Sequence, residues 1–300
     1  MNRSGSQWRL SPTLSIELDQ PRLMGILNIT PDSFSDGGSY ASADLAAERA
    51  LEMESQGATI IDVGGESTRP GADRIDARDQ VARVVPVITA IRRHSEIPIS
   101  IDTTLSAVAE AAVDAGAQAI NDVSAGLEDP GILALAARRN CGLILMHRLR
   151  PPGEDCFSTQ YRQPPSYDDV VGEVGRFLRD RAQAAREAGV AAETIVVDPG
   201  LGFGKSVAQN WELIRQSDRL VAEGYPVLGA ASRKSFLEVI CGPDVPASRR
   251  GPASVAASII QYRGGIRLFR VHDVGLHAAG LARAHREGSP TVPGPVSTLL

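Results

Sequence analysis

The sequence has few cysteines, no long apolar run and no excess of basic residues. Its three cysteines are Cys141, Cys156 and Cys241, which stand far apart and form no CxxC pair. An odd number of separated cysteines without an apolar leader segment indicates reduced thiols, and therefore a cytoplasmic protein. No stretch approaches the roughly 18 consecutive apolar residues of a membrane span. These absences disfavour disulfide-rich secreted proteins, membrane-spanning proteins and zinc sites built from paired cysteines.

Charge and composition exclude further classes of protein. The chain has 300 residues with 31 Lys+Arg and 36 Asp+Glu, which gives a formal net charge of −5. Such a chain lacks the general basic field that binds a nucleic-acid backbone. The hydrophobic share of 43% and the charged share of 22% are typical of a soluble globular protein. We expect one domain over residues 1–300, with its core at about 22–285 and a flexible tail at about 288–300.

Short, almost continuously apolar segments alternate with Ala-rich segments of helical periodicity. Such apolar runs are typical of parallel strands that are buried on both faces. The eight expected strands are Leu23–Ile29, Thr59–Val63, Ile97–Asp102, Ala119–Val123, Gly142–His147, Thr194–Asp198, Pro226–Ala230 and Ile266–His272. The expected helices include Ser42–Gln56, Arg78–His94, Leu105–Ala115, Val170–Ala188 and Ala253–Arg263. Eight alternations in about 250 residues predict an α/β fold, a single (β/α)8 TIM barrel, with a doubly wound open sheet as the alternative.

Smaller signals refine this architecture. Gly57, Gly116 and Gly189 follow expected helices and precede new strands, as helix C-caps do. Residues 8–22 form a short N-terminal extension that alternates weakly and could be a hairpin at the bottom of the barrel. Residues 149–168 are rich in proline and have no period, so we expect a long loop after the fifth strand.

Every expected strand ends in, or leads into, a residue that can take part in chemistry. These residues are Asn28, Asp62, Asp102, Asn121 with Asp122, His147, Asp198, Ser232 to Lys234, and Arg270 with His272. A single polar residue at a strand end is usually a helix cap or a turn former. Eight independent caps are a poor account of the whole set. In a barrel all eight carboxyl ends face one mouth, where active sites lie.

The chemistry of these residues indicates the kind of ligand. Three of them are hydrogen-bond acceptors: Asp102, Asn121 and Asp198. They suit the amino and ring N–H groups of a flat heterocycle, such as the edge of a pterin or a guanine. Lys234 suits the carbonyl oxygen or a ring nitrogen of that heterocycle. Arg270 and His272, with Asn28 opposite, suit an anion, and the last two strands of a barrel commonly bind phosphate. We expect a heterocycle that carries a phosphate-type group.

Two glycine-containing loops complete the expected mouth. Residues 30–38 read TPDSFSDGG and residues 64–71 read GGESTRPG. Both are longer than a typical βα turn, so they could act as lids that exclude water. Ordinary surface loops are the alternative for each. Phe34 is unusual in a solvated turn, and Arg69 could pair with an anion of the substrate.

Taken together, these segments resemble the dihydropteroate synthase family. The matching segments read MGILNITPDSFSDGG at 24–38, DVGGESTRPGA at 62–72, SIDT at 100–103, INDVSAG at 120–126, LILMH at 143–147, DPGLGFGK at 198–205, ASRKSF at 231–236 and FRVHDV at 269–274. The resemblance implies a (β/α)8 barrel that joins 6-hydroxymethyl-7,8-dihydropterin pyrophosphate to p-aminobenzoate. The products are 7,8-dihydropteroate and pyrophosphate, in folate biosynthesis. It also implies assistance by Mg²⁺, competition by sulfonamides at the aminobenzoate site, and a homodimer.

The resemblance assigns roles to individual positions. The pterin would be held by Asp102, Asn121, Asp198 and Lys234, with Asp62 and Met146 also binding substrate. The pyrophosphate would be held by Asn28, Arg270 and His272, with Asn28 near the magnesium. The aminobenzoate would be surrounded by Thr68, Arg69, Pro70, Phe203 and Ser232, and Phe34 lies on the first loop. The residues expected to act in catalysis are Asn28, Asp102, Lys234, Arg270 and His272.

The sequence also departs from the family at a few places. Arg148, Leu149 and Arg150 follow His147 where the family has a different stretch, and the next loop is longer than usual. Ala125 stands where the family often has glycine. Two other functions remain open: a pterin-binding paralogue with little synthase activity, and a methyltransferase-like protein that binds methyltetrahydrofolate. The intact loop residues and anion ligands favour the synthase over both.

Overall fold

Eight parallel strands close into a barrel in a computed structural model that describes residues 6–29 and 39–288. The strands are β3 (Arg22–Asn28), β4 (Ile60–Gly64), β5 (Ile99–Asp102), β6 (Ala119–Asp122), β7 (Gly142–Met146), β8 (Ile195–Asp198), β9 (Leu228–Gly229) and β10 (Leu268–Val271). Their order is β8-β7-β6-β5-β4-β3-β10-β9, and a parallel bridge between Val197 and Val227 joins the two ends of the sheet. The predicted barrel is therefore confirmed, and the open doubly wound sheet is excluded.

The strand residues alternate between two cores. Those that point outward, such as Leu23, Ile61 and Ile99, belong to one large cluster with the apolar faces of the helices. Those that point inward near the strand starts form a second cluster, which includes Met24 and Ile60. This alternation is what a strand buried on both faces requires, and it explains the continuous apolar runs in the sequence.

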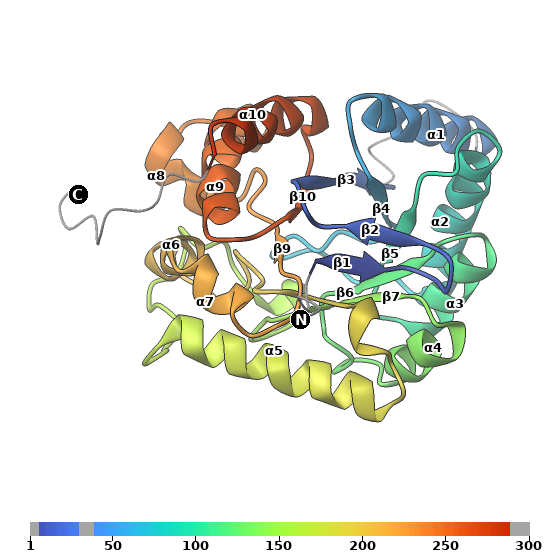
Figure 1. The fold of residues 1–300 in the computed structure, drawn as a ribbon, viewed down its shortest axis with the longest axis horizontal. Coiled ribbons are helices and arrows are strands. Elements are labelled where there is room, and N and C mark those ends of the chain that lie inside the picture. The colour runs from blue at the N-terminus through green and yellow to red at the C-terminus, as the bar shows by residue number, and fades with distance from the viewer. Residues whose placement is uncertain (1–5, 30–38, 289–300) are drawn as a thin grey trace.

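A ring of helices surrounds the strands (Figure 1). The helices are α1 (Ser39–Ser55), α2 (Ala77–Arg92), α3 (Ser106–Asp114), α4 (Gly131–Arg139), α5 (Val170–Glu187), α6 (Val207–Arg215), α7 (Ser217–Val221), α8 (Glu238–Cys241), α9 (Gly251–Arg263) and α10 (Val274–Arg286). The expected glycine caps are confirmed, because Gly57, Gly116 and Gly189 have φ of +103°, +117° and +97°. No helix within the described residues is long and apolar enough to cross a membrane.

An antiparallel hairpin closes the bottom of the barrel, as predicted. Strand β1 (Gln7–Arg9) pairs with β2 (Ser15–Glu17), and Figure 1 looks onto the barrel end that they cover. The hairpin side chains Trp8 and Leu10 are fully buried against the inward residues of the barrel strands. The Trp8 indole Nε1 donates to the Thr194 carbonyl oxygen at 2.8 Å. The hairpin thus occupies this end of the barrel, and the carboxyl ends of the strands lie at the other end.

Three details differ from the sequence predictions. Asp62 was expected to end its strand, which is wrong, because β4 continues to Gly64. The register pairs Asp62 with Ser100 and pairs Gly64 with Asp102, so Asp62 lies one inward layer deeper than Asp102. The expected strand Pro226–Ala230 is shorter, with only Leu228–Gly229 in the sheet. The predicted loop 149–168 contains one short 3-10 turn at Pro152–Glu154. Residues 30–38, with Phe34, and the expected tail from 289 lie outside the described residues.

Candidate active site

The inward column changes from apolar to charged at the carboxyl half of the barrel. Above the apolar layer lie five polar side chains on four strands: Asp62, Ser100, Asp102, Asn121 and Arg270. The register places Asp62 beside Ser100, and Asp102 beside Asn121. Because every second residue of a strand points inward, these neighbours share one polar floor beneath the mouth.

Arg270 stands at the centre of this floor between two carboxylates. Its Nε donates to Asp62 Oδ2 at 2.6 Å, and its Nη2 donates to Asp102 Oδ2 at 2.7 Å. Burial lowers the pKa of Arg270, but the carboxylates of Asp62 and Asp102 outweigh it and raise that pKa above its ordinary value. A guanidinium carries five N–H donors, so these contacts use two of them.

Asp62 is held by neighbours in its own layer as well. Its Oδ2 also accepts from Asn121 Nδ2 at 3.1 Å, and its Oδ1 accepts from the Ser100 hydroxyl. Both oxygens are therefore bonded within the protein, and the side chain is fully buried. Asp62 is arranged to orient Arg270 and Asn121 rather than to meet a ligand.

Asp102 and Asp198 present buried acceptors toward the mouth. Asp102 Oδ1 is buried and has no hydrogen-bond partner among the described residues. Burial raises the pKa of Asp102 to about 7; Arg270 opposes the rise and Asp62 adds to it. Burial also raises the pKa of Asp198, whose Oδ1 accepts from the Gly200 amide at 2.7 Å. An unpaired buried acceptor is costly, so Asp102 Oδ1 is a strong candidate for a ligand N–H.

The Lys234 side chain places a cation against the loop that follows Asp198. Its Nζ donates to the Leu201 carbonyl oxygen and lies 4.8 Å from the centre of the Phe203 ring. Burial lowers the pKa of Lys234 to about 8, and the nearby Asp198 carboxylate opposes this shift. Phe203 in turn forms a small apolar cluster with Val123 and Met146. The mouth therefore offers an apolar wall beside buried acceptors and a partly buried amine, which suits a flat polar ring.

Lys205, the last residue of the glycine-rich segment 199–205, is fully buried and bonds carbonyl groups of that segment. Its Nζ donates to the carbonyl oxygens of Gly200 and Phe203 at 3.0 and 2.8 Å, and lies 2.8 Å from His147 Nδ1. These three acceptors match the three donors of an ammonium group. Burial lowers the pKa of Lys205 to about 7, and burial together with Lys205 lowers that of His147 to about 2.

His272 and Ser232 form a second pair at the ends of β10 and β9. The Ser232 hydroxyl accepts from the His272 amide at 3.1 Å and lies 3.0 Å from His272 Nδ1. Burial, with the nearby Arg233 and Arg270, lowers the pKa of His272 to about 3. The ring is therefore neutral at pH 7, and a Ser232 hydroxyl that donates to Nδ1 leaves the proton on Nε2. In this tautomer His272 Nε2 is a donor for an anion.

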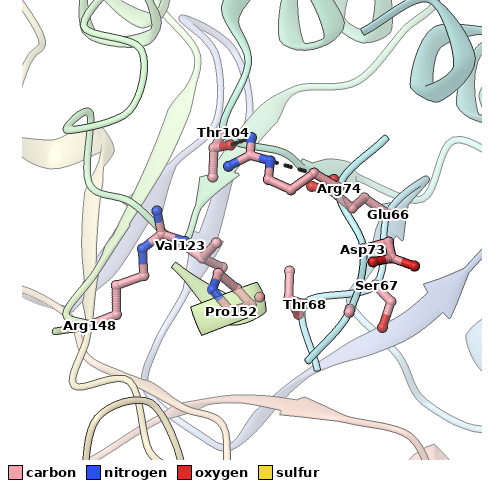
Figure 2. A pocket seen from close by; sticks show the side chains of 11 residues that line it. Glu66, Ser67, Thr68, Asp73, Arg74, Thr104, Val123, Arg148 and Pro152 are labelled. Carbon is pink, nitrogen blue, oxygen red and sulfur yellow. Dashed lines mark hydrogen bonds and ion pairs between the residues drawn. The ribbon is translucent and has the colours of Figure 1, made fainter. Parts of the chain in front are cut away.

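The second loop lines a pocket at the side of the mouth (Figure 2). The lining residues are Glu66, Ser67, Thr68, Ala72, Asp73, Arg74, Thr104, Val123, Arg148, Pro152 and Gly153. Figure 2 shows Arg74 reaching Thr104 on one side, and Thr68 and Pro152 on the other. Arg74 and Arg148 each bond one oxygen of Glu128, and Arg74 also lies 3.8 Å from Glu66, so two carboxylates balance the two cations of this pocket.

The predicted residues on the strands lie together at one mouth, except Asp62, which lies one layer deeper. The predicted Phe34 lies outside the described residues. Asn28, Asp102, Asn121, Asp198 and Arg270 come from five different strands. Sequence reasoning missed Ser100 and Lys205. Ser100 could have been found from its spacing of two before Asp102, which places both on the inward face. The role of Lys205 depends on a fold of the loop that no local pattern reveals.

The barrel mouth can now be set beside known proteins. Residues 24–272 match the family of pterin-binding enzymes. A dihydropteroate synthase from Streptococcus pyogenes is 46% identical over 252 residues, which cover 84% of this chain and 90% of the relative. The chain belongs to the dihydropteroate synthase family. Its activity is therefore that of a dihydropteroate synthase.

Solved structures of the family agree with the fold. A dihydropteroate synthase from Xanthomonas albilineans, solved with 4-aminobenzoic acid, has a TM-score of 0.84 and 39% identity. The match covers 96% of this chain and 100% of the chain in that structure. The synthase from Yersinia pestis in a sulfonamide complex has a TM-score of 0.84 and 36% identity, and covers 95% of this chain and 100% of its own. The family's barrel thus extends over nearly the whole chain.

Proposed function

We propose that this barrel mouth joins 6-hydroxymethyl-7,8-dihydropterin pyrophosphate to p-aminobenzoate in folate biosynthesis. The observation that carries the proposal is the meeting of buried acceptors with anion donors at one end of the barrel. Asp102 Oδ1 has no partner among the described residues, and Arg270 lies 2.7 Å from the other oxygen of the same carboxylate. An N–H donor of a ligand would bond Asp102 Oδ1, and a negative charge would bond the remaining donors of Arg270. A pterin pyrophosphate carries both groups.

The pterin would lie on the polar floor. Asp102 and Asp198 would accept its amino and ring N–H groups, and Asn121 would add a further contact. Lys234 would donate to the ring carbonyl or to a ring nitrogen, and Met146 would pack against the ring. Because Asp102, Asn121 and Asp198 are buried, their contacts would count for more than they would in water.

The pyrophosphate would lie toward β10. Arg270 keeps unused N–H donors after pairing with its two carboxylates, and the neutral His272 would donate from Nε2. As the bond from the exocyclic methylene to oxygen breaks, the pyrophosphate leaves with the electron pair. Charge that develops on it would be stabilised by these donors. The electron-rich ring can support the cation at the methylene, so a dissociative route fits.

Magnesium fits as a partner of the pyrophosphate. No three His, Cys, Asp or Glu side chains gather to hold a metal ion within the described parts of the chain. Mg²⁺ does not need such a cage, because it commonly binds one or two protein oxygens together with substrate phosphates and waters. Asn28 would supply one oxygen; its Oδ1 lies beside Gly64 at the mouth, close to Asp102. The bound ion would neutralise charge on the leaving group.

The aminobenzoate would enter between the two loops. Phe203 and Ser232 would form one wall, and Thr68, Arg69 and Pro70 the other, with Phe34 on the first loop. The aniline nitrogen is neutral at pH 7, so it can attack the methylene carbon without a general base and lose its proton afterwards. Sulfonamides would compete for the same space, and closure of the loops would keep water from the cation.

The assembly and the compartment complete the proposal. Four apolar side chains are exposed on α8, α9 and α10: Val239, Ile240, Ile260 and Leu276. These helices are neighbours (Figure 1), and exposed apolar side chains on neighbouring helices favour a homodimer, which sedimentation would detect. The three free cysteines favour a reducing compartment, the cytoplasm. The net charge of −5 gives no reason to expect a nucleic-acid partner.

Purified protein with both substrates and magnesium tests the reaction directly. Formation of 7,8-dihydropteroate is expected, and its absence while pterin still binds would favour a paralogue without synthase activity. His272→Ala tests the anion site, because removal of Arg270 would leave two buried carboxylates without their counter-charge. We expect this variant to bind the pyrophosphate ester about ten-fold more weakly and the bare hydroxymethyl pterin almost unchanged. Equal weakening of both ligands in calorimetry would contradict the assignment.

A further inference from the structure

The segment 149–168 contacts both described walls of the proposed aminobenzoate pocket, although no step of the reaction uses it. One contact partner is the second loop, residues 64–71 with the adjoining Ala72, and we call it loop two below. It carries Thr68, Arg69 and Pro70. The other is the glycine-rich segment 199–205, which carries Phe203. The segment has no sequence period and was predicted only as a long loop, so its contacts at the mouth point to a role that the sequence does not indicate.

Asp155 attaches the segment to the glycine-rich loop. Its carboxylate is buried, and its Oδ2 accepts from the Gly204 amide at 2.8 Å. Its Oδ1 accepts from the Cys156 amide at 2.9 Å and from the Tyr161 hydroxyl. Tyr167 adds a second link, because its hydroxyl donates to the Gly204 carbonyl oxygen at 3.0 Å. Both peptide groups of Gly204 are therefore bonded to the same segment.

Further contacts make this attachment specific. The added Cβ of an alanine at Gly204 would lie 2.7 Å from Leu149 Cβ, so the Leu149 side chain packs closely against the Gly204 backbone. Asn210 Nδ2 donates to the Ser158 hydroxyl at 3.0 Å, and its Oδ1 accepts from the Gly202 amide at 2.6 Å. Gly202 and Gly204, two alternate glycines of the loop, are thus each held by partners outside the loop.

The other end of the segment touches loop two. The Pro152 carbonyl oxygen accepts from the Gly71 amide at 2.9 Å. A Cβ built on Gly153 would lie 3.2 Å from the Ala72 carbonyl oxygen. Figure 2 shows Pro152 near Thr68 at the edge of the side pocket. Only two residues separate Pro152 from Asp155, so one short turn spans the two loops.

We propose that segment 149–168 is a strut that sets the distance between the two walls of the aminobenzoate pocket, with Asp155 as its positioning residue. The proposal rests on the proposed function of this site. Phe203 lies next to Gly204, whereas Leu201, whose carbonyl oxygen binds Lys234, lies three residues away beside Gly200, which Lys205 holds. Release of Gly204 would therefore move the aryl wall while the strand residues Asp102 and Asn121 stay in place. The strut should act on p-aminobenzoate rather than on the pterin.

The first test measures the attachment without any substrate. Asp155→Ala should speed hydrogen exchange of the Gly204 amide about ten-fold or more, because its acceptor is lost. Glu154→Ala is the matched control, since the neighbouring Glu154 has the same charge but is exposed. Unchanged exchange at Gly204 in Asp155→Ala would overturn the strut. This result does not depend on whether the protein makes dihydropteroate.

The second test measures the consequence for the substrates. In Asp155→Ala we expect the KM for p-aminobenzoate to rise about ten-fold, with the KM for the pterin pyrophosphate changed less than two-fold. Asp155→Asn, which keeps one acceptor oxygen, should restore much of the loss. Equal rises of both KM values, or no rise for p-aminobenzoate, would overturn the proposal.

Two further arrangements keep the test decisive. If Asp155→Ala does not fold, Tyr167→Phe removes only the hydroxyl and should raise the same KM about three-fold. If the unmodified protein makes no dihydropteroate, the proposed function fails. Calorimetry of p-aminobenzoate with pterin and pyrophosphate present then compares Asp155→Ala with Glu154→Ala, and equal affinities would overturn the strut.

Discussion

Buried ionisable side chains determine how single residues of this mouth respond to pH. His147 is 5% exposed and has Lys205 Nζ at 2.8 Å from its Nδ1. Burial and this cation lower its pKa to about 2. The folded protein therefore holds His147 neutral, while the unfolded chain protonates it near pH 6.5.

The sign of the resulting pH dependence follows from proton counting. Between pH about 6 and about 3 the unfolded chain binds one more proton at His147, so the contribution of His147 to the free energy of unfolding falls as pH falls, by about 1.4 kcal/mol per pH unit. His147→Gln keeps an acceptor for Lys205 but cannot be protonated. We expect denaturant unfolding between pH 4 and pH 7 to show a shallower slope for this variant. His94→Gln changes an exposed histidine and is the control; identical slopes for His147→Gln and the parent would contradict the prediction.

Residue roles could be predicted where position alone determines direction. Asp102, Asn121 and Asp198 lie at the ends of apolar runs, and the carboxyl ends of all strands in a barrel lie at the same mouth. Asp155 and Lys205 could not be assigned in this way. Their partners come from loops whose paths depend on packing between distant segments. Local sequence patterns do not indicate such contacts.

At the scale of elements, the turn after β8 has the strictest backbone requirement. Gly200 has φ of +66°, and a Cβ added there would lie 1.8 Å from the His147 carbonyl oxygen. This distance is far below any real contact, so the turn and the end of β7 would have to separate. The same turn places Asp198 on one side and the Lys205 acceptors on the other.

Gly200→Ala should therefore destabilise the protein by at least about 3 kcal/mol and weaken pterin binding. The matched control is Gly224→Ala. Gly224 also has positive φ, +93°, but a Cβ added there would meet no heavy atom within 4 Å. Its cost should be only the backbone strain, about 1–2 kcal/mol. Thermal unfolding of both variants measures the difference, and similar losses would show that the contact with His147 is relieved cheaply.

Element boundaries were less predictable than element order. Each of the eight strands appeared in sequence as an apolar run, because each is buried on both faces. Asp62 was expected to end its strand, since a buried aspartate is rare inside one. The strand continues because Arg270, Asn121 and Ser100 satisfy its carboxylate. Such compensation comes from three other strands and cannot be read from the segment itself.

The whole molecule separates stability and chemistry between the two ends of the barrel. The hairpin closes one end with an apolar cluster that includes Trp8, Leu10, Ile16 and Leu18. The polar residues of the site gather at the other end. This division is typical of barrels, where the carboxyl end of the strands carries catalysis and the amino end carries packing. The weak alternation in residues 8–22 was enough to predict the hairpin, because a short amphipathic ribbon needs an apolar surface to cover.

Trp8→Ala tests this division. Trp8 is fully buried, and its indole donates to the Thr194 carbonyl oxygen, so removal of the ring leaves both a cavity and an unpaired acceptor. We expect the free energy of unfolding to fall by about 3–5 kcal/mol. Trp8→Phe keeps most of the ring and should cost about 1–2 kcal/mol, largely for the lost hydrogen bond. Because the hairpin lies at the opposite end from Asp102 and Arg270, both KM values should stay within about two-fold at temperatures where the variants are folded. Denaturant unfolding and steady-state kinetics on the same preparations give the two quantities, and a large rise in either KM would show that packing at the bottom of the barrel reaches the site.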